Sequence, residues 1–238
     1  MIPISDDNPA RLVPFVTWLI LGGCIGVFVW QLGMSADAED QAIRSLAFVP
    51  ARFFGDDGGI LSRTEGSMAA IWPSATTLTS MFLHGGLLHL LGNMLYLWIF
   101  GNNVEDAMGH SRFLFFYLVC GVVAALSQGI VTPTSQIPMI GASGAISGVL
   151  AAYVLIFPRA RVTVIVPLGI IFYPMKISAL FVVGFWFLLQ LFSVAVAPPD
   201  QPGVAWWAHI GGFGAGAILT PLLSYFPLFG RHRRSPWR

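Results

Sequence analysis

Long uncharged stretches dominate the hydrophobic pattern of this chain. No Asp, Glu, Lys or Arg occurs in residues 12–36, 66–104, 113–158, 162–175, 177–199 and 201–230. One helix needs about 20 apolar residues to cross a bilayer. The 46-residue stretch 113–158 is interrupted between Gly129 and Pro138, which predicts two helices joined by a turn. With one span in each other long stretch (at about 80–100 in the second), the pattern predicts six transmembrane helices.

Two connecting segments are also predicted from this pattern. The uncharged stretch 162–175 is too short to span a membrane and contains Pro167, Gly169 and Pro174, so we expect an interfacial loop. The long loop 34–78 contains apolar pieces such as residues 46–54. We expect this large first outer loop to be partly embedded in the membrane.

Composition and charge narrow the class of protein. The chain is 56% hydrophobic and 10% charged, whereas soluble domains contain about 25% charged residues. A net charge of +1 and a short basic tail argue against nucleic acid as a partner. We predict an all-α polytopic membrane protein with a cytoplasmic tail over 1–10, a six-helix membrane domain over 11–228 and a basic cytoplasmic tail over 229–238.

The distribution of positive charge predicts the orientation. Lys and Arg prefer cytoplasmic loops. Six spans place both termini on one side, and that side carries nine basic residues against three on the other: Arg11, Arg112, Arg159, Arg161, Lys176, Arg231, Arg233, Arg234 and Arg238 against Arg44, Arg52 and Arg63. We therefore expect both termini in the cytoplasm.

Neutral polar residues remain in three places within the predicted spans. The second span contains His84, His89 and Asn93, and the last two are four residues apart on one helix face. The fourth span begins with Gly141-Ala-Ser143-Gly144 and continues to Ser147-Gly148, and the sixth contains His209-Ile-Gly-Gly212 and Gly216. Because small residues let transmembrane helices approach closely, we expect the fourth and sixth spans to touch.

The depth of these side chains suggests a chemical site. At about 1.5 Å per residue, Ser143 lies roughly 22 Å, His209 roughly 24 Å and His89 roughly 18 Å above the cytoplasmic interface. A Ser beside a His predicts a nucleophile with its general base. Asn93, His89 and the backbone N–H of Ser143 are candidates for binding an oxyanion. No carboxylate lies in these spans, so we predict a Ser–His dyad, with no metal and no cofactor.

These residues resemble the motifs of the rhomboid intramembrane serine proteases. Gly141–Gly144 is similar to the family's GxSG motif, and His209–Gly216 to its HxxGxxxG motif. His84, His89 and Asn93 match its second-span motif, and Glu105–Gly109 looks like its ExxxG stretch. The resemblance covers about residues 11–228.

The resemblance implies a function and roles for individual residues. Ser143 would be the nucleophile and His209 the base, with His89 and Asn93 in the oxyanion hole. The protein would be a serine endopeptidase that cleaves transmembrane protein substrates near the outer face of the bilayer. Spans two and five would flank substrate entry, with Phe185, Trp186 and Phe187 as candidate gate residues. Lipids would surround it, and a prokaryotic plasma (inner) membrane is the expected location.

Two departures from the family pattern are visible. Ala75 and Thr76 stand where many members have Trp-Arg, so we expect other contacts, such as those of Trp72, to stabilise the first loop. Ser147 stands where some members have a Tyr that stacks on the catalytic His. A hydrogen bond from Ser147 is therefore one expected way of orienting His209.

Simpler interpretations stand beside these. Ser143 alone is typical of a helix cap, and a lone buried His is often structural. Glu105 and Asp106 are expected in a solvated loop, where they cap backbone groups. The alternative function is a catalytically inactive rhomboid-like protein that binds membrane-protein clients. A small transporter is disfavoured because its midplane would carry a charged residue or a broken helix.

Overall fold

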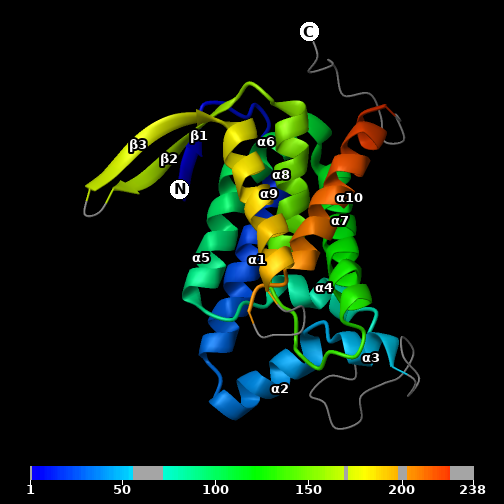
Figure 1. Cartoon of the computed structure of the whole chain (residues 1–238). Coiled ribbons are helices and arrows are strands. Elements are labelled where there is room, and N and C mark those ends of the chain that lie inside the picture. Colours follow the sequence, from blue (N-terminus) through cyan, green and yellow to red (C-terminus); the bar gives the residue numbers. More distant parts are fainter. Residues whose placement is uncertain (1, 56–71, 169–170, 198–202, 226–238) are drawn as a thin grey trace.

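Residues 2–55, 72–168, 171–197 and 203–225 are described by a computed structural model (Figure 1). Each of the six predicted spans contains a helix that reaches along the bundle. In chain order these are α1 (Phe15–Leu32), α5 (Leu87–Tyr96) with its continuation, α7 (His110–Val131), α8 (Ser143–Ile156), α9 (Ala179–Val196) and α10 (Trp206–Tyr225). Strand β1 and the last turn of α10 lie at the same end of the bundle.

The six elements differ in whether their helices are long enough to cross a membrane. Among the described residues, α1, α7 and α9 are each long and apolar enough to cross a membrane, and the bent pair Thr76–Phe82 and Leu87–Met108 adds a fourth candidate. Helix α8 is apolar but has only 14 residues. The helical bundle is therefore established, and the count of six spans stays a prediction.

The second predicted span is displaced along the sequence. Its helix begins at Leu87 rather than near residue 80, and it continues through the π-helical segment η3 (Leu97–Gly101) into α6 (Asn102–Met108). The preceding short helices α4 (Thr76–Thr79) and η2 (Ser80–Phe82) meet it at 98°. Gly86, whose φ is +156°, makes the corner possible.

A three-stranded antiparallel sheet corrects two sequence predictions. Strands β1 (Ile2–Asp6), β2 (Arg161–Leu168) and β3 (Ile171–Ser178) pair in the order β1-β2-β3. The fold is thus not all-α, and the predicted interfacial loop over 162–175 is a hairpin. Strand β1 lies within the predicted tail over 1–10, whose cytoplasmic location stays a prediction. Alternation explains the hairpin, because Val162 and Val164 are buried whereas Thr163 between them is half-exposed.

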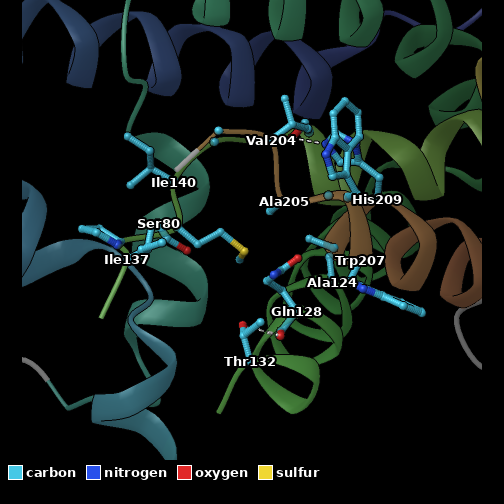
Figure 2. Close-up of a pocket in the computed structure, with 18 of the residues that line it drawn as sticks. Ser80, Ala124, Gln128, Thr132, Ile137, Ile140, Val204, Ala205, Trp207 and His209 are labelled. Carbon is cyan, nitrogen blue, oxygen red and sulfur yellow. Dashed lines mark hydrogen bonds between the residues drawn. The ribbon is translucent and has the colours of Figure 1, made fainter. Parts of the chain in front are cut away.

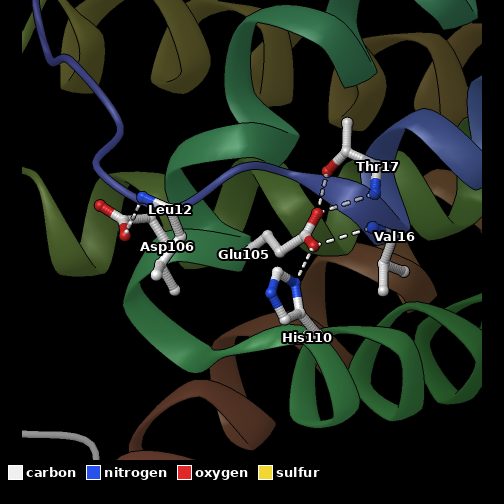
Figure 3. A network of polar contacts seen from close by, with 6 residues as sticks. All are labelled: Leu12, Val16, Thr17, Glu105, Asp106 and His110. Atoms are coloured by element: carbon white, nitrogen blue, oxygen red, sulfur yellow. Dashed lines mark hydrogen bonds and ion pairs between the residues drawn. The ribbon is translucent and has the colours of Figure 1, made fainter.

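The predicted solvated loop around Glu105 is also wrong. Glu105 lies in α6, is completely buried, and accepts hydrogen bonds from the backbone N–H groups of Val16 and Thr17 at 2.8 and 2.7 Å (Figure 3). It also accepts from Thr17 Oγ1 at 2.6 Å and pairs with His110 Nδ1 at 2.5 Å. The carboxylate therefore caps the first turn of α1 from a different helix, where the helix dipole favours negative charge. The predicted capping of backbone groups is confirmed.

The first long connection contains two helices, α2 (Ala36–Leu46) and α3 (Pro50–Phe54), at the end of the bundle opposite the sheet (Figure 1). Thr79 Oγ1 donates to Leu46 O at 2.6 Å, and Phe48 forms a β-bridge with Met139. These contacts fix the described part of the loop. Residues 56–71 of the predicted outer loop 34–78, and the predicted tail over 229–238, lie outside the described residues. Embedding of the loop stays a prediction.

Thr76, at one position of the absent Trp-Arg pair, has a local role. Its side chain is buried and its hydroxyl donates to Pro73 O at 2.6 Å. Trp72, the expected substitute contact, is 45% exposed. One contact from this segment to the first loop is the hydrogen bond from Thr79, one turn later, to Leu46 O.

Candidate active site

A tight turn places Ser143 at the first residue of α8. Gly141 just before it has φ +115°, which a glycine adopts without strain, and its N–H donates to Ser80 O at 2.9 Å. The first N–H groups of an α-helix have no partner within the helix, and its dipole places partial positive charge there. The half-buried Ser143 side chain therefore lies beside backbone donors that can stabilise a negative charge.

His209 meets Ser143 from the first turn of α10. The distance between His209 Nε2 and Ser143 Oγ is 2.8 Å, which is hydrogen-bond contact. The imidazole is 8% exposed. The two side chains expected to meet at similar depth are thus in direct contact, although 66 residues separate them in sequence.

Glycines allow this contact by removing side chains between α8 and α10. A Cβ atom added to Gly212 would lie 2.6 Å from Ser147 Oγ, and one added to Gly216 would lie 2.6 Å from Gly148 Cα. Only glycine fits at such distances, so the two backbones touch as the small-residue pattern predicted. Gly144 faces α7 as well, because a Cβ there would lie 2.6 Å from Ala124 Cβ.

Gln190 is a site residue that sequence reasoning missed. Its side chain is 4% exposed, and its Oε1 lies 2.8 Å from His209 Nδ1. The signal in the sequence is the lone amide in the uncharged stretch 177–199. Its role is not evident from the sequence, because it is not part of a cluster of polar residues and its partner, His209, lies on another helix.

Ser147 does not take the role expected of it. Its hydroxyl donates to Gly144 O, one turn earlier in α8, at 2.6 Å. The rings near His209 are those of Trp186 and Trp206, with centroids 5.7 and 6.1 Å from the imidazole. His209 is therefore held by Gln190 and two tryptophans rather than by Ser147.

His89 and Asn93 face the turn before Ser143 from α5. A Cβ atom on Gly141 would lie 2.7 Å from His89 Nε2 and 3.7 Å from Asn93 Nδ2. Asn93 Nδ2 is buried and has no hydrogen-bond partner among the described residues. An unpaired buried donor is costly, so this amide is available for a group that enters the site.

His84 belongs to the surrounding structure. It is completely buried, and Gln31 of α1 pairs with its backbone N–H and C=O, each at 3.1 Å. Its ring contacts that of His89 at a centroid distance of 5.2 Å. His84 therefore fixes the corner before α5 and supports the His89 ring.

A cavity of about 620 Å³ adjoins Ser143 and His209. Figure 2 shows its lining side chains, with one side formed by Val204, Ala205 and His209 and the other by Ser80, Ile137 and Ile140. Gln128 of α7 and Thr132, which follows the end of α7, make a polar part of the wall. The cavity is large enough for several side chains of a peptide beside the Ser143 hydroxyl.

The three candidate gate side chains point in different directions. Trp186 lies against His209, and the Phe187 ring stacks on Phe213 of α10 with centroids 4.1 Å apart. Phe185 is 47% exposed. Two of the three thus fasten α9 to α10.

Comparison with known proteins identifies the family to which this chain belongs. The family described as "Rhomboid domain" matches residues 72–226, more than half of the chain. The chain belongs to the rhomboid family. It is therefore a membrane-embedded rhomboid, as its motifs suggested.

Named relatives of this rhomboid include one rhomboid protease and several rhomboid-like proteins. It is 34% identical to "Rhomboid protease GluP" of Bacillus subtilis (strain 168) over 154 residues, which is 63% of this chain and 27% of that protein. It is 31% identical to "RHOMBOID-like protein 4" of Arabidopsis thaliana, over 64% of this chain and 35% of that protein. It is 38% identical to human "Presenilin-associated rhomboid-like protein, mitochondrial" over 41% of this chain and 25% of that protein. The chain thus spans about a quarter to a third of each relative's length.

Proposed function

We propose that this rhomboid is an intramembrane serine endopeptidase that uses a Ser143–His209 dyad. The observation that carries the proposal is the 2.8 Å contact between Ser143 Oγ and His209 Nε2 at the edge of the cavity. Hydrogen-bond contact between nucleophile and base is the geometry that nucleophilic catalysis requires. Similarity to a relative named as a rhomboid protease supports the same conclusion.

The reaction is an acyl transfer in two halves. His209 Nε2 takes the proton of Ser143 as Oγ attacks the scissile carbonyl carbon, and then gives that proton to the departing amine as the peptide bond breaks. In the second half His209 removes a proton from water, which attacks the acyl-enzyme and releases the carboxylic acid. Ser143 recovers its proton from His209.

The negative charge of each tetrahedral intermediate must be stabilised by hydrogen-bond donors. The backbone N–H of Ser143 and the unpaired Nδ2 of Asn93 are placed around the turn at Gly141. His89, whose ring borders the same turn and cavity, is the third candidate donor. Donors fixed before the reaction stabilise the transition state without reorganisation.

The position of the Ser143–His209 site along the bundle suggests which class of substrate is cleaved. Helices α8 and α10 begin at the α4 end of the bundle, away from the sheet (Figure 1), and their first turns carry Ser143 and His209. If both termini are cytoplasmic, this is the outer end, so transmembrane protein substrates are cut near the outer face of the bilayer. A prokaryotic inner membrane is the location we propose.

Cleavage of a transmembrane reporter in proteoliposomes tests the proposal. Wild type should cleave it, whereas Ser143→Ala and His209→Ala should not. Ser147→Ala is the matched control, because it removes a hydroxyl one turn away whose hydrogen bond goes to Gly144 O. Cleavage that persists in Ser143→Ala would refute the assignment.

Reaction with a fluorophosphonate probe separates the protease from an inactive client-binding rhomboid. An activated Ser143 should be labelled in wild type, and labelling should disappear in Ser143→Ala. Absence of both labelling and cleavage in folded wild type would favour the inactive alternative.

A further inference from the structure

The amide of Gln190 is fixed in one orientation. Its Nε2 donates to Trp186 O, one turn earlier in α9, at 3.0 Å. This leaves Oε1 directed at His209 Nδ1, 2.8 Å away. An amide oxygen accepts hydrogen bonds and cannot donate them. His209 Nδ1 must therefore carry a hydrogen to make this contact.

That constraint selects the tautomer of His209. A neutral imidazole carries one hydrogen, so protonation at Nδ1 leaves the lone pair on Nε2. Nε2 is the atom that lies 2.8 Å from Ser143 Oγ. The base is thus held in the form that accepts the Ser143 proton.

We propose that Gln190 is the positioning residue of this site and completes a hydrogen-bonded Ser143–His209–Gln190 triad, in which the amide takes up no proton. It acts through His209, and the proposal rests on the endopeptidase function proposed above. In serine proteases a carboxylate usually holds this nitrogen. A neutral amide makes the same hydrogen bond without burying a charge, which is costly inside a membrane.

The hydrogen bond between His209 and Gln190 depends on how α9 packs against α10. The buried residues of α9 are Ala179, Val182 and Val183 near its start, and Gln190. In the second half of the helix, all of which the structure describes, Gln190 is therefore the one fully buried side chain. Movement of α9 away from α10 would separate Gln190 from His209 and so remove this hydrogen bond from the base.

Kinetics of Gln190→Met and Gln190→Glu test the proposal, with Leu189→Ala as a control on the exposed side of the same helix. Loss of one hydrogen bond to the base predicts a kcat about tenfold lower for Gln190→Met at unchanged KM. Gln190→Glu restores an acceptor and should recover kcat. Its carboxylate also stabilises the imidazolium, so activity on the acidic side should be lost at higher pH than in wild type. His89 is the other titratable side chain that borders this part of the cavity, and it is unchanged in every variant.

Nitrogen-15 NMR of histidine-labelled protein gives a readout that does not need activity. The His209 signals, assigned by their loss in His209→Gln, should show a protonated Nδ1 in wild type and a mixture of tautomers in Gln190→Met. Wild-type kcat and an unchanged tautomer in Gln190→Met would refute the positioning role of Gln190 and leave the proposed endopeptidase function intact. An inactive wild type would overturn the function itself. A Gln190→Met protein that fails to fold leaves Gln190→Glu to decide, and a pH profile there that is the same as in wild type would count against the role of Gln190.

Discussion

Replacement of Glu105 by Ala should destabilise this protein far more than replacement of the neighbouring carboxylate, Asp106. The Glu105 side chain is completely buried and accepts two backbone hydrogen bonds from the first turn of α1. Each buried donor left without a partner costs about 1–3 kcal/mol, which gives about 2–6 kcal/mol for the pair. His110 is 47% exposed, so water can reach part of the network. We therefore expect a loss of about 3 kcal/mol.

The free energy of unfolding in detergent micelles, measured by titration with a denaturing detergent, provides the assay. Asp106→Ala is the matched control, because Asp106 also accepts two backbone hydrogen bonds, from Arg11 and Leu12, but at a more exposed position. It should cost about 0.5–1 kcal/mol. Equal effects of the two substitutions would show that burial of the Glu105 network does not determine its contribution.

Three further predictions address the site and the sheet. Asn93→Ala should lower kcat about 100-fold with little change in KM, because it removes an oxyanion donor; an unchanged kcat would exclude that role. Gly216→Ala should cost about 1–3 kcal/mol of stability because the new methyl collides with Gly148, whereas Gly214→Ala, with open space around it, should be tolerated; similar unfolding free energies for both would contradict the packing argument. Burial raises the pKa of the Asp6 carboxyl above its ordinary value of 3.8, so its favourable contribution is complete below about pH 4 and is lost as pH rises through the folded-state pKa. Unfolding free energies from pH 4 to 8 should therefore show Asp6→Asn gaining stability relative to wild type as pH rises, and the opposite trend would refute this.

Sequence reasoning succeeded where apolar length and small-residue spacing determine structure. Uncharged stretches locate the six helices of the bundle, because charged side chains are expensive within a bilayer. The glycines at 212 and 216 predict the α8–α10 contact, since close helix approach needs small residues. Ser143 and His209 then meet because each lies near the start of its helix.

Structure that depends on distant partners was not predictable in the same way. The sheet needs a strand at residues 2–6 to pair with residues more than 150 positions later. Gln190 is a single amide whose function depends on where α10 places His209. Glu105 follows the second uncharged stretch, and its burial arises because α6 extends the helix and meets the first turn of α1.

Backbone contact between α8 and α10 also bears on temperature. Side chains that fill a helix interface change rotamer as a protein warms, and the spacing between the helices drifts with them. Where Gly212 and Gly216 lie directly on the α8 backbone, that source of drift is missing. The Ser143–His209 distance is then set by the thickness of two main chains, so heating should unfold this bundle before it gradually misaligns the two reacting side chains.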